Sequence, residues 1–553
     1  MTTTDQEFSE KLSRLRSLLF QFDSKNNELK AGMLKELILL VPKKHGSFMQ
    51  FHQVLMCMMA YPSDKSLLEL VEKTTSRLLT ILNQNSSLRE KLSGTGLLHT
   101  AIECNFTFNK VNYLILRFPN QVSIHSAASS LDTQKSVLKL ILPNTEYSRI
   151  HAGEKDFKSR ISQFHFSTKQ TDLEWLMQTI LQSGLDQKIQ SLLYNQLGIY
   201  IQWSVSNETD SLSFLRGTSL PVYYHTTPLE KKTDFQSIVS GKLPAALKLN
   251  LNERRQFIHS AKMSLVYLYR ETEPFTNANE EDITVFQLDK GISVALFGST
   301  VDKRYSLESY IGYLVLKNNI PVSYGGGWIF GERCQFGINI LESFRGGESA
   351  LIICELLRVY HQHFGATRFV VKPYQFGLHN PEAIKTGAFW FYYKLGFRPE
   401  NKTLKELALQ EENQKLMDPK YKSEAATLKK YTKSNIALTL TESSYPDYDS
   451  ELLSQRITAY INEHFNGDRQ KALSVCFNEL KKNTGIETEK WKPEDIDYAK
   501  HVSVLFYIKP GSCEWQKKHQ KNIQQFILLK SEKTEISWIK HLQRFDAFWE
   551  YIK

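Results

Sequence analysis

A glycine pair beside an arginine stands between a predicted strand and a predicted helix. Residues 336–341 before it are apolar and strand-like, and residues 351–364 after it form a strongly apolar helix-like run. Such a turn exposes backbone N–H groups at the positive end of a helix, a physical basis for holding a phosphate or pyrophosphate. The alternative is a turn that only ends the strand, with its carboxylate stabilised by the helix dipole. The loop consists of Arg345, Gly346, Gly347, Glu348, Ser349 and Ala350.

A second group of residues that could take part in a reaction lies at the end of the next predicted helix, 381–395. Five consecutive aromatic residues, 389–393, lead into Lys394, Leu395, Gly396 and Phe397. A phenol with an ordinary pKa near 10 keeps its proton at neutral pH, so a tyrosine here could serve as an acid. Core packing is the competing explanation for the aromatic run, and Tyr392 is the member open to either role.

The elements around these motifs predict a sheet that is mostly antiparallel. Runs rich in β-branched and aromatic residues favour strands, at 283–288, 292–297, 310–316, 320–324, 325–330 and 334–341. Residues 317–319 are a hairpin turn signal within this meander. Three glycines, 325–327, predict either a bulge that opens the sheet to a substrate or a flexible corner. Further strands are expected at 368–372 and 435–440.

The flanking segments have helical periodicity. We expect an all-α domain of bundle or repeat-like type over 1–207, a connector over 208–280 with a helix at 251–270, and a helical region over 443–553. Between them lies an α+β domain, 281–442, with a helical insertion at 403–432.

Composition describes an ordinary globular protein. The 553 residues are 41% hydrophobic and carry a formal charge of +10. The basic residues are scattered rather than concentrated, so nucleic acid is not an expected partner. The six cysteines contain no CxxC pair, which argues against a zinc site and a disulfide framework. No signal peptide or membrane span is apparent, so we expect a cytoplasmic protein.

The order of these elements and motifs resembles the GNAT superfamily of acyl-coenzyme A-dependent N-acyltransferases, over residues 283–440. The family's phosphate loop, Gln/Arg-x-x-Gly-x-Gly/Ala, is matched at Arg345 and Ala350, while Glu348 stands in place of its central glycine. A carboxylate beside a pyrophosphate is unfavourable unless it turns away. The family's second signature, Tyr-x-Lys-Leu-Gly-Phe, is matched from Tyr392 to Phe397.

The resemblance implies an acyl-coenzyme A co-substrate and an amine acceptor, either a small molecule or a protein. Tyr392 would protonate the departing thiolate, and backbone groups of Ile340 and Leu341 would pair with the pantetheine arm. The general base is Glu342 as first choice, Glu332 as second, or a water relay.

Two other function classes stay open. One is a binding or scaffold protein that keeps the GNAT fold without catalysis, favoured by Glu348. The other is a transferase that uses aminoacyl-tRNA, which the basic charge permits. The N-terminal helical domain could present a protein partner in any of these cases.

Overall fold

A computed structural model of the chain describes residues 3–40, 44–147, 156–165, 169–229, 233–442 and 447–553. The chain divides into two compact units. Unit 1 contains Met1–Leu229, Arg255–Asn277 and Lys317–Pro321, and unit 2 contains Glu230–Arg254, Ala278–Leu316 and Val322–Lys553. The predicted connector, 208–280, is divided between the units: 208–229 and 255–277 belong to unit 1, and 230–254 and 278–280 belong to unit 2.

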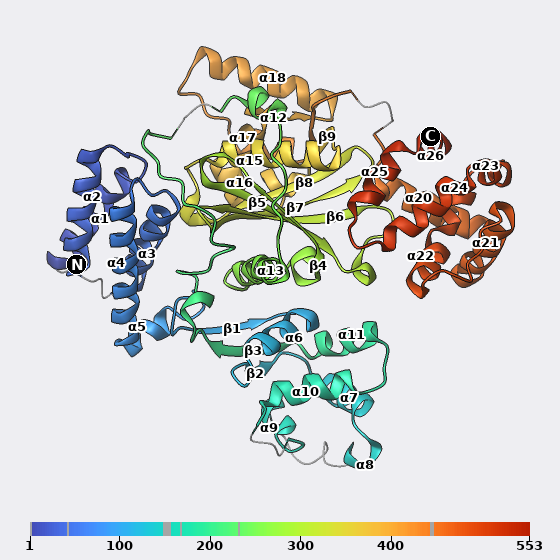
Figure 1. The fold of residues 1–553 in the computed structure, drawn as a ribbon, viewed down its shortest axis with the longest axis horizontal. Helices are drawn as coiled ribbons and strands as arrows, with labels where there is room; N and C mark the ends of the chain where they lie inside the picture. The colour runs from blue at the N-terminus through green and yellow to red at the C-terminus, as the bar shows by residue number, and fades with distance from the viewer. Residues whose placement is uncertain (1–2, 41–43, 148–155, 166–168, 230–232, 443–446) are drawn as a thin grey trace. The chain divides into compact units, whose positions relative to one another are not determined.

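Unit 1 begins with amphipathic helices, as their periodicity predicts (Figure 1). In α4, apolar residues three or four positions apart, such as Leu67, Val71 and Leu78, are buried. The carboxylate of Asp64 caps this helix by accepting from the Leu67 N–H at 2.8 Å. The helices here are α1 (Thr3–Ser17), α2 (Ser24–Leu37), α3 (His45–Ala60), α4 (Lys65–Asn83) and α5 (Ser86–Lys91).

The prediction that residues 1–207 are all helical is wrong. Three strands, β1 (Ala101–Asn105), β2 (Ser123–Ala127) and β3 (Ile199–Ser204), form an antiparallel sheet in the order β1-β3-β2. Buried and exposed residues alternate along β3, which is the period of a half-buried strand. These strands are short and are separated in the sequence by helices. Their alternating pattern covers too few residues to predict strands within a segment of helical periodicity.

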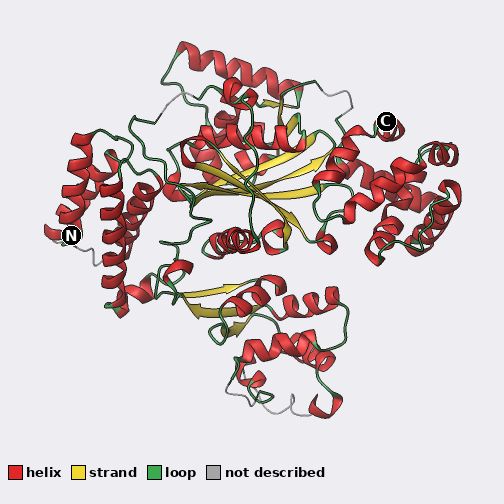
Figure 2. Cartoon of the chain, viewed as in Figure 1, coloured by secondary structure: helices red, strands yellow, loops and turns green. Residues whose placement is uncertain are grey.

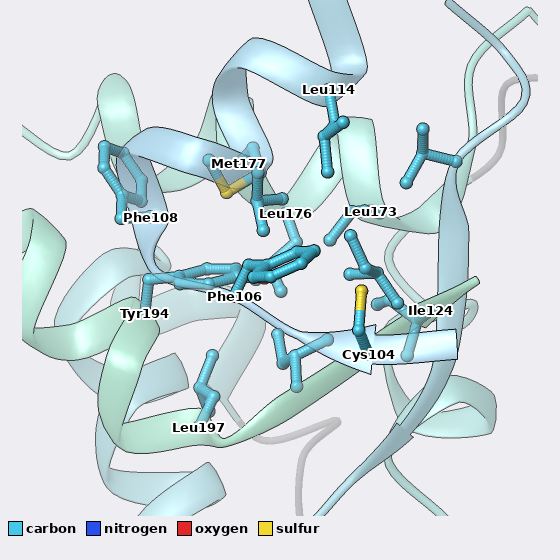
Figure 3. Packing of buried hydrophobic residues seen from close by; sticks show 14 of the residues in the cluster. Cys104, Phe106, Phe108, Leu114, Ile124, Leu173, Leu176, Met177, Tyr194 and Leu197 are labelled. Carbon is cyan, nitrogen blue, oxygen red and sulfur yellow. The ribbon is translucent and has the colours of Figure 1, made fainter. Parts of the chain in front are cut away.

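One face of this small sheet packs against helices to make a single core. Figure 3 shows side chains from β1, β2, α6, α10 and α11 meeting there, with the Cys104 thiol among them. The remaining helices of the segment are α6 (Phe108–Arg117), α7 (Leu131–Ile141), α8 (Asn144–Tyr147), α9 (Phe157–Ile161), α10 (Asp172–Leu181), α11 (Gln187–Leu197) and α14 (Glu273–Thr276).

Helix α13 (Leu251–Val266) is four residues shorter than predicted. Its chain continues through Tyr269, whose φ of +54° is outside the right-handed helical region.

The large sheet, whose strands are yellow in Figure 2, is mixed and mostly antiparallel. Its strand order is β10-β11-β9-β8-β7-β6-β5-β4. The predicted meander is confirmed as consecutive neighbours from β4 to β8. Its strands are β4 (Ala278–Gln287), β5 (Ile292–Ser299), β6 (Ser309–Lys317), β7 (Ile320–Phe330), β8 (Arg333–Ile340), β9 (Arg368–Val371), β10 (Arg398–Pro399) and β11 (Ile436–Thr439).

The glycine run 325–327 is neither a bulge nor a corner. It lies inside β7, in unbroken antiparallel register with β8 from Ser323↔Ile340 to Phe330↔Arg333. The small residues are needed for close packing, because a Cβ at Gly327 would lie 2.6 Å from the Cys334 Sγ. The predicted turn is a hairpin, with φ of +48° at Asn318 and +68° at Asn319.

The helix after the glycine loop is α15 (Ser349–Val359), extended by a π-helical turn, Tyr360–Phe364, and ended by Gly365 in the left-handed conformation. The predicted helix 381–395 is in fact two helices, α16 (Pro381–Thr386) and α17 (Ala388–Lys394), because Gly387 breaks it with a φ of +67°. The insertion is helical as predicted, with α18 (Lys402–Met417) and α19 (Ala425–Tyr431).

The C-terminal region is helical, as predicted. Its helices are α20 (Ser450–Phe465), α21 (Arg469–Thr484), α22 (Pro493–Ser503), α23 (Ser512–Lys518), α24 (Gln520–Leu528), α25 (Ile536–Arg544) and α26 (Asp546–Ile552). Unit 2 also contains α12 (Phe235–Ser240), which packs against α15.

Candidate active site

Strands β8 and β9 pair over only three residues and then part. They are parallel, with Arg333–Gln335 facing Arg368–Val370. Strand β8 continues to Ile340 in full register with β7, so its other edge is not paired with β9 beyond Gln335 in the described structure. We call this parting of the two strands the fork. A free strand edge offers N–H and C=O groups to an extended ligand.

Gln375 and Tyr392 lie at the fork. A Cβ on Gly337 of β8 would be 3.1 Å from the Gln375 Nε2, so this glycine leaves room for the amide. The Tyr392 hydroxyl lies 3.5 Å from the Gln375 Oε1. Tyr392 is only 3% exposed, and burial raises the pKa of its phenol well above the ordinary value. The phenol therefore keeps its proton at neutral pH, as an acid must.

The glycine loop connects the end of β8 to the start of α15, as the sequence predicts. Gly346 has a φ of +87°, and Glu348 is the residue preceding the first helical turn. The main-chain oxygen of Glu348 accepts from the Ile352 N–H at 2.9 Å. Glu348 is only 8% exposed and makes no side-chain cap hydrogen bond to the helix, at whose N-terminus a phosphate would lie.

Arg345 has protein partners for its guanidinium. Its Nη1 lies 2.6 Å from the Glu382 Oε1 and its Nε donates to the Ile340 oxygen at 3.2 Å. The ion pair is well exposed, at 54% for Arg345 and 66% for Glu382, and an exposed pair is weak. A phosphate could therefore compete with Glu382 for this arginine.

Of the backbone groups expected to hold a pantetheine arm, two already have hydrogen-bond partners within the protein. The Leu341 N–H donates to the Val322 oxygen at 2.9 Å, on the β7 side. The Ile340 oxygen accepts from Arg345, so it too has a partner.

The two carboxylates predicted as bases lie at opposite ends of β8. At about 3.3 Å per residue, the seven steps of this strand separate them by more than about 23 Å. Glu332 is on the turn before β8, where its Oε2 accepts from the Thr367 hydroxyl at 3.2 Å. It is five residues from Gly337, about 16 Å along the strand, so it does not reach the fork. Glu342 is exposed on the 3₁₀ turn Glu342–Phe344.

A cleft of about 650 Å³ opens on unit 2 beside the last paired residue of β8, and sequence reasoning missed it. Its lining comes from segments up to about two hundred residues apart, which no local pattern connects. The polar and aromatic members nearest the sheet are Glu308, Trp328, Gln335, Lys372, Asp449 and Ser450.

No protein family, curated protein or solved structure matches the chain. Within the described residues, no helix has both the length and the apolar character needed to cross a membrane. All six cysteines are free thiols, and only Cys513 is exposed.

Proposed function

We propose that the protein transfers an acyl group from a coenzyme A thioester to an amine. The fork is the observation that carries this proposal. A parallel pair that ends after three residues leaves one edge of β8 open, directly before a glycine loop and a helix N-terminus. This succession suits a ligand with an extended polar arm at one end and a pyrophosphate at the other, as in the GNAT superfamily that the sequence resembles.

The residues at the fork supply the required chemistry. Attack of an amine on a thioester places negative charge on the carbonyl oxygen, which N–H groups of a free strand edge can stabilise. The departing thiolate then takes a proton, and the Tyr392 phenol, protonated and buried, is the donor. Tyr392 recovers its proton from the nitrogen of the new amide.

The phosphate end of the ligand would lie at the loop. Backbone N–H groups of Gly346 and Gly347 and the first turn of α15 supply donors and a positive dipole. Arg345 joins them by exchanging Glu382 for a phosphate oxygen. Glu348 opposes this binding by its charge.

The second candidate function is a binding or scaffold protein without catalysis. Two observations favour it: Arg345 is already paired with Glu382, and a glutamate, Glu348, is the N-cap residue of the helix that a phosphate would approach. A third candidate, transfer from aminoacyl-tRNA, has only the basic charge in its favour.

Calorimetry with acetyl- and longer acyl-coenzyme A tests the proposal on the full chain. Acyl transfer requires saturable binding and a raised melting temperature with the thioester. A lack of binding by all the thioesters would overturn the proposal in favour of the scaffold. RNA binding that falls steeply with salt would instead support the third candidate.

A further inference from the structure

The 650 Å³ cleft of unit 2 begins two residues from the fork. Gln335 lines the cleft and is also the last residue of β8 paired with β9. Gly337, the residue beside Gln375, lies on the same face of β8, about 7 Å further along the strand. A small molecule in the cleft would therefore be within reach of a group held at the fork.

Glu308 is a partly buried carboxylate of this cleft, and its side-chain hydrogen bond is with a hydroxyl rather than a cation. The Ser450 hydroxyl donates to its Oε2 at 2.7 Å. The Lys530 ammonium donates to the main-chain oxygen of Glu308 at 2.9 Å and forms its ion pair with the Glu535 carboxylate. Among the described residues no Lys, Arg or His nitrogen forms an ion pair with the Glu308 carboxylate. Burial, and then the charge of Asp449, raise its pKa, and they outweigh the Ser450 hydrogen bond and the charges of Lys530 and Arg333, which lower it.

Lys530 and Arg333 act on Glu308 through their charges, but each forms its ion pair with another carboxylate. The Arg333 Nη2 lies 3.2 Å from the Asp449 carboxylate, and this arginine is therefore ion-paired with Asp449 rather than with Glu308. Lys372 lies near Asp449 and lowers the pKa of that carboxyl, and His501 and Glu451 line the cleft at exposed positions. Within the described chain no group of three His, Cys, Asp or Glu could hold a metal ion. An organic cation is therefore the more suitable ligand for the open carboxylate.

A stacked aromatic pair contributes one of its rings, Trp328, to the lining of the same cleft. The rings of Trp328 and Tyr310 are stacked, with centroids 3.9 Å apart and planes 10° from parallel. Gly326 makes room for this stacked pair, because a Cβ there would lie 2.5 Å from the Tyr310 ring. Leu307 and Ile457 extend the apolar lining. The indole of Trp328 is half-buried and lines the cleft, where it can contact a flat apolar group or a cation.

We propose that this cleft binds the acceptor, a primary amine on an aromatic body, with Glu308 as its proton acceptor. This inference rests on the proposed acyl transfer. Glu308 takes one proton from the ammonium, the freed nitrogen attacks the thioester carbonyl, and the carbon–sulfur bond breaks. The nitrogen's second proton replaces the one that Tyr392 gives to the thiolate. The first proton passes from Glu308 to water, and the products are an amide and a free thiol.

Binding is tested first, without a thioester. The probes are 2-phenylethylamine, 2-phenylethanol and 3-phenylpropanoate, which share one ring and differ in charge. The full chain should bind the amine about tenfold more tightly than the alcohol. This ratio of dissociation constants corresponds to the binding free energy contributed by one partly buried ion pair. Glu308→Gln should remove that preference and leave alcohol binding unchanged. Glu463→Gln, an exposed change on α20 outside the cleft, is the matched control.

Trp328→Leu is a second variant and should weaken amine and alcohol binding alike. Equal binding of the three probes, or an amine preference that survives Glu308→Gln, would overturn the inference.

Transfer from acetyl-coenzyme A is measured second. Glu308→Gln should lower turnover about 10²-fold and abolish the acid limb of its pH profile, with thioester affinity unchanged. The two proposals fail separately. Amine selectivity without thioester binding would overturn acyl transfer and leave the cleft assignment standing. Thioester binding without amine selectivity would overturn the cleft assignment alone.

Discussion

Arg345 and Glu382 form an ion pair at 2.6 Å that joins the glycine loop to helix α16. This pair holds the guanidinium that a phosphate would need. Whether the loop binds an anion therefore depends on a competition between the Glu382 carboxylate and a phosphate, which carries more charge and more acceptor oxygens.

Removing the Glu382 carboxylate, which competes with a phosphate for Arg345, should strengthen cofactor binding. We expect Glu382→Gln to tighten acetyl-coenzyme A binding several-fold, and Arg345→Glu to weaken it, with both measured by calorimetry. The pair is exposed, so melting temperatures should change little. Glu406→Gln, on helix α18, is a control for a lost surface charge. Unchanged dissociation constants in both variants would remove the loop from the phosphate site.

Glu348 should oppose cofactor binding through its charge. Glu348→Gln keeps the size of the side chain and removes the negative charge, so we expect affinity for acetyl-coenzyme A to rise by up to about tenfold. The gain should shrink for a ligand without phosphates, such as acetyl-pantetheine. An equal gain for both ligands would show that the charge does not face a pyrophosphate.

Tyr392→Phe should cut turnover by about 10²-fold or more if the phenol protonates the thiolate. Stability should change little, because the 3.5 Å contact of the hydroxyl with the Gln375 Oε1 is at the distance limit of a hydrogen bond. Tyr393→Phe is a matched control on the same helix, since that hydroxyl donates to Glu412 at 2.8 Å. Turnover lost equally in both variants would point to a structural cause.

A buried charge cluster predicts a pH-dependent stability. Burial, and then the charge of Glu535, raise the pKa of Asp282 from 3.8 to about 7. Between these two values the folded state binds more protons than the unfolded state, so the contribution of Asp282 is favourable below about pH 4 and is lost as the pH rises through 7.

Asp282→Asn should therefore stabilise the protein at pH 8, by about 2 kcal/mol, and have little effect near pH 4. The amide oxygen can still accept the Glu535 N–H, which Asp282 accepts at 3.1 Å. Denaturant unfolding at both pH values is the measurement. The exposed neighbour Glu281, paired with Lys533, provides Glu281→Gln as a control without this pH dependence. A gain of the same size at both pH values would contradict the assignment.

The sequence by itself determined most of the secondary structure of the large sheet and of the helices around it. The strands of the meander, the Asn318–Asn319 hairpin and the strand–loop–helix order around Gly346 and Gly347 all follow from local periodicity and turn chemistry, which adjacent residues express. Local periodicity did not predict the break at Gly387 or the strands β1, β2 and β3, because a short element contains too few periods for its pattern to be recognised.

Only the tertiary structure decided what these elements bring together. The fork depends on where β8 and β9 stop pairing, and the pairing of Arg345 with Glu382 depends on the packing of α16. The cleft joins Glu308 to Ser450 across 142 residues. A sequence pattern records the period of each element, whereas contacts between distant side chains are set by how those elements pack.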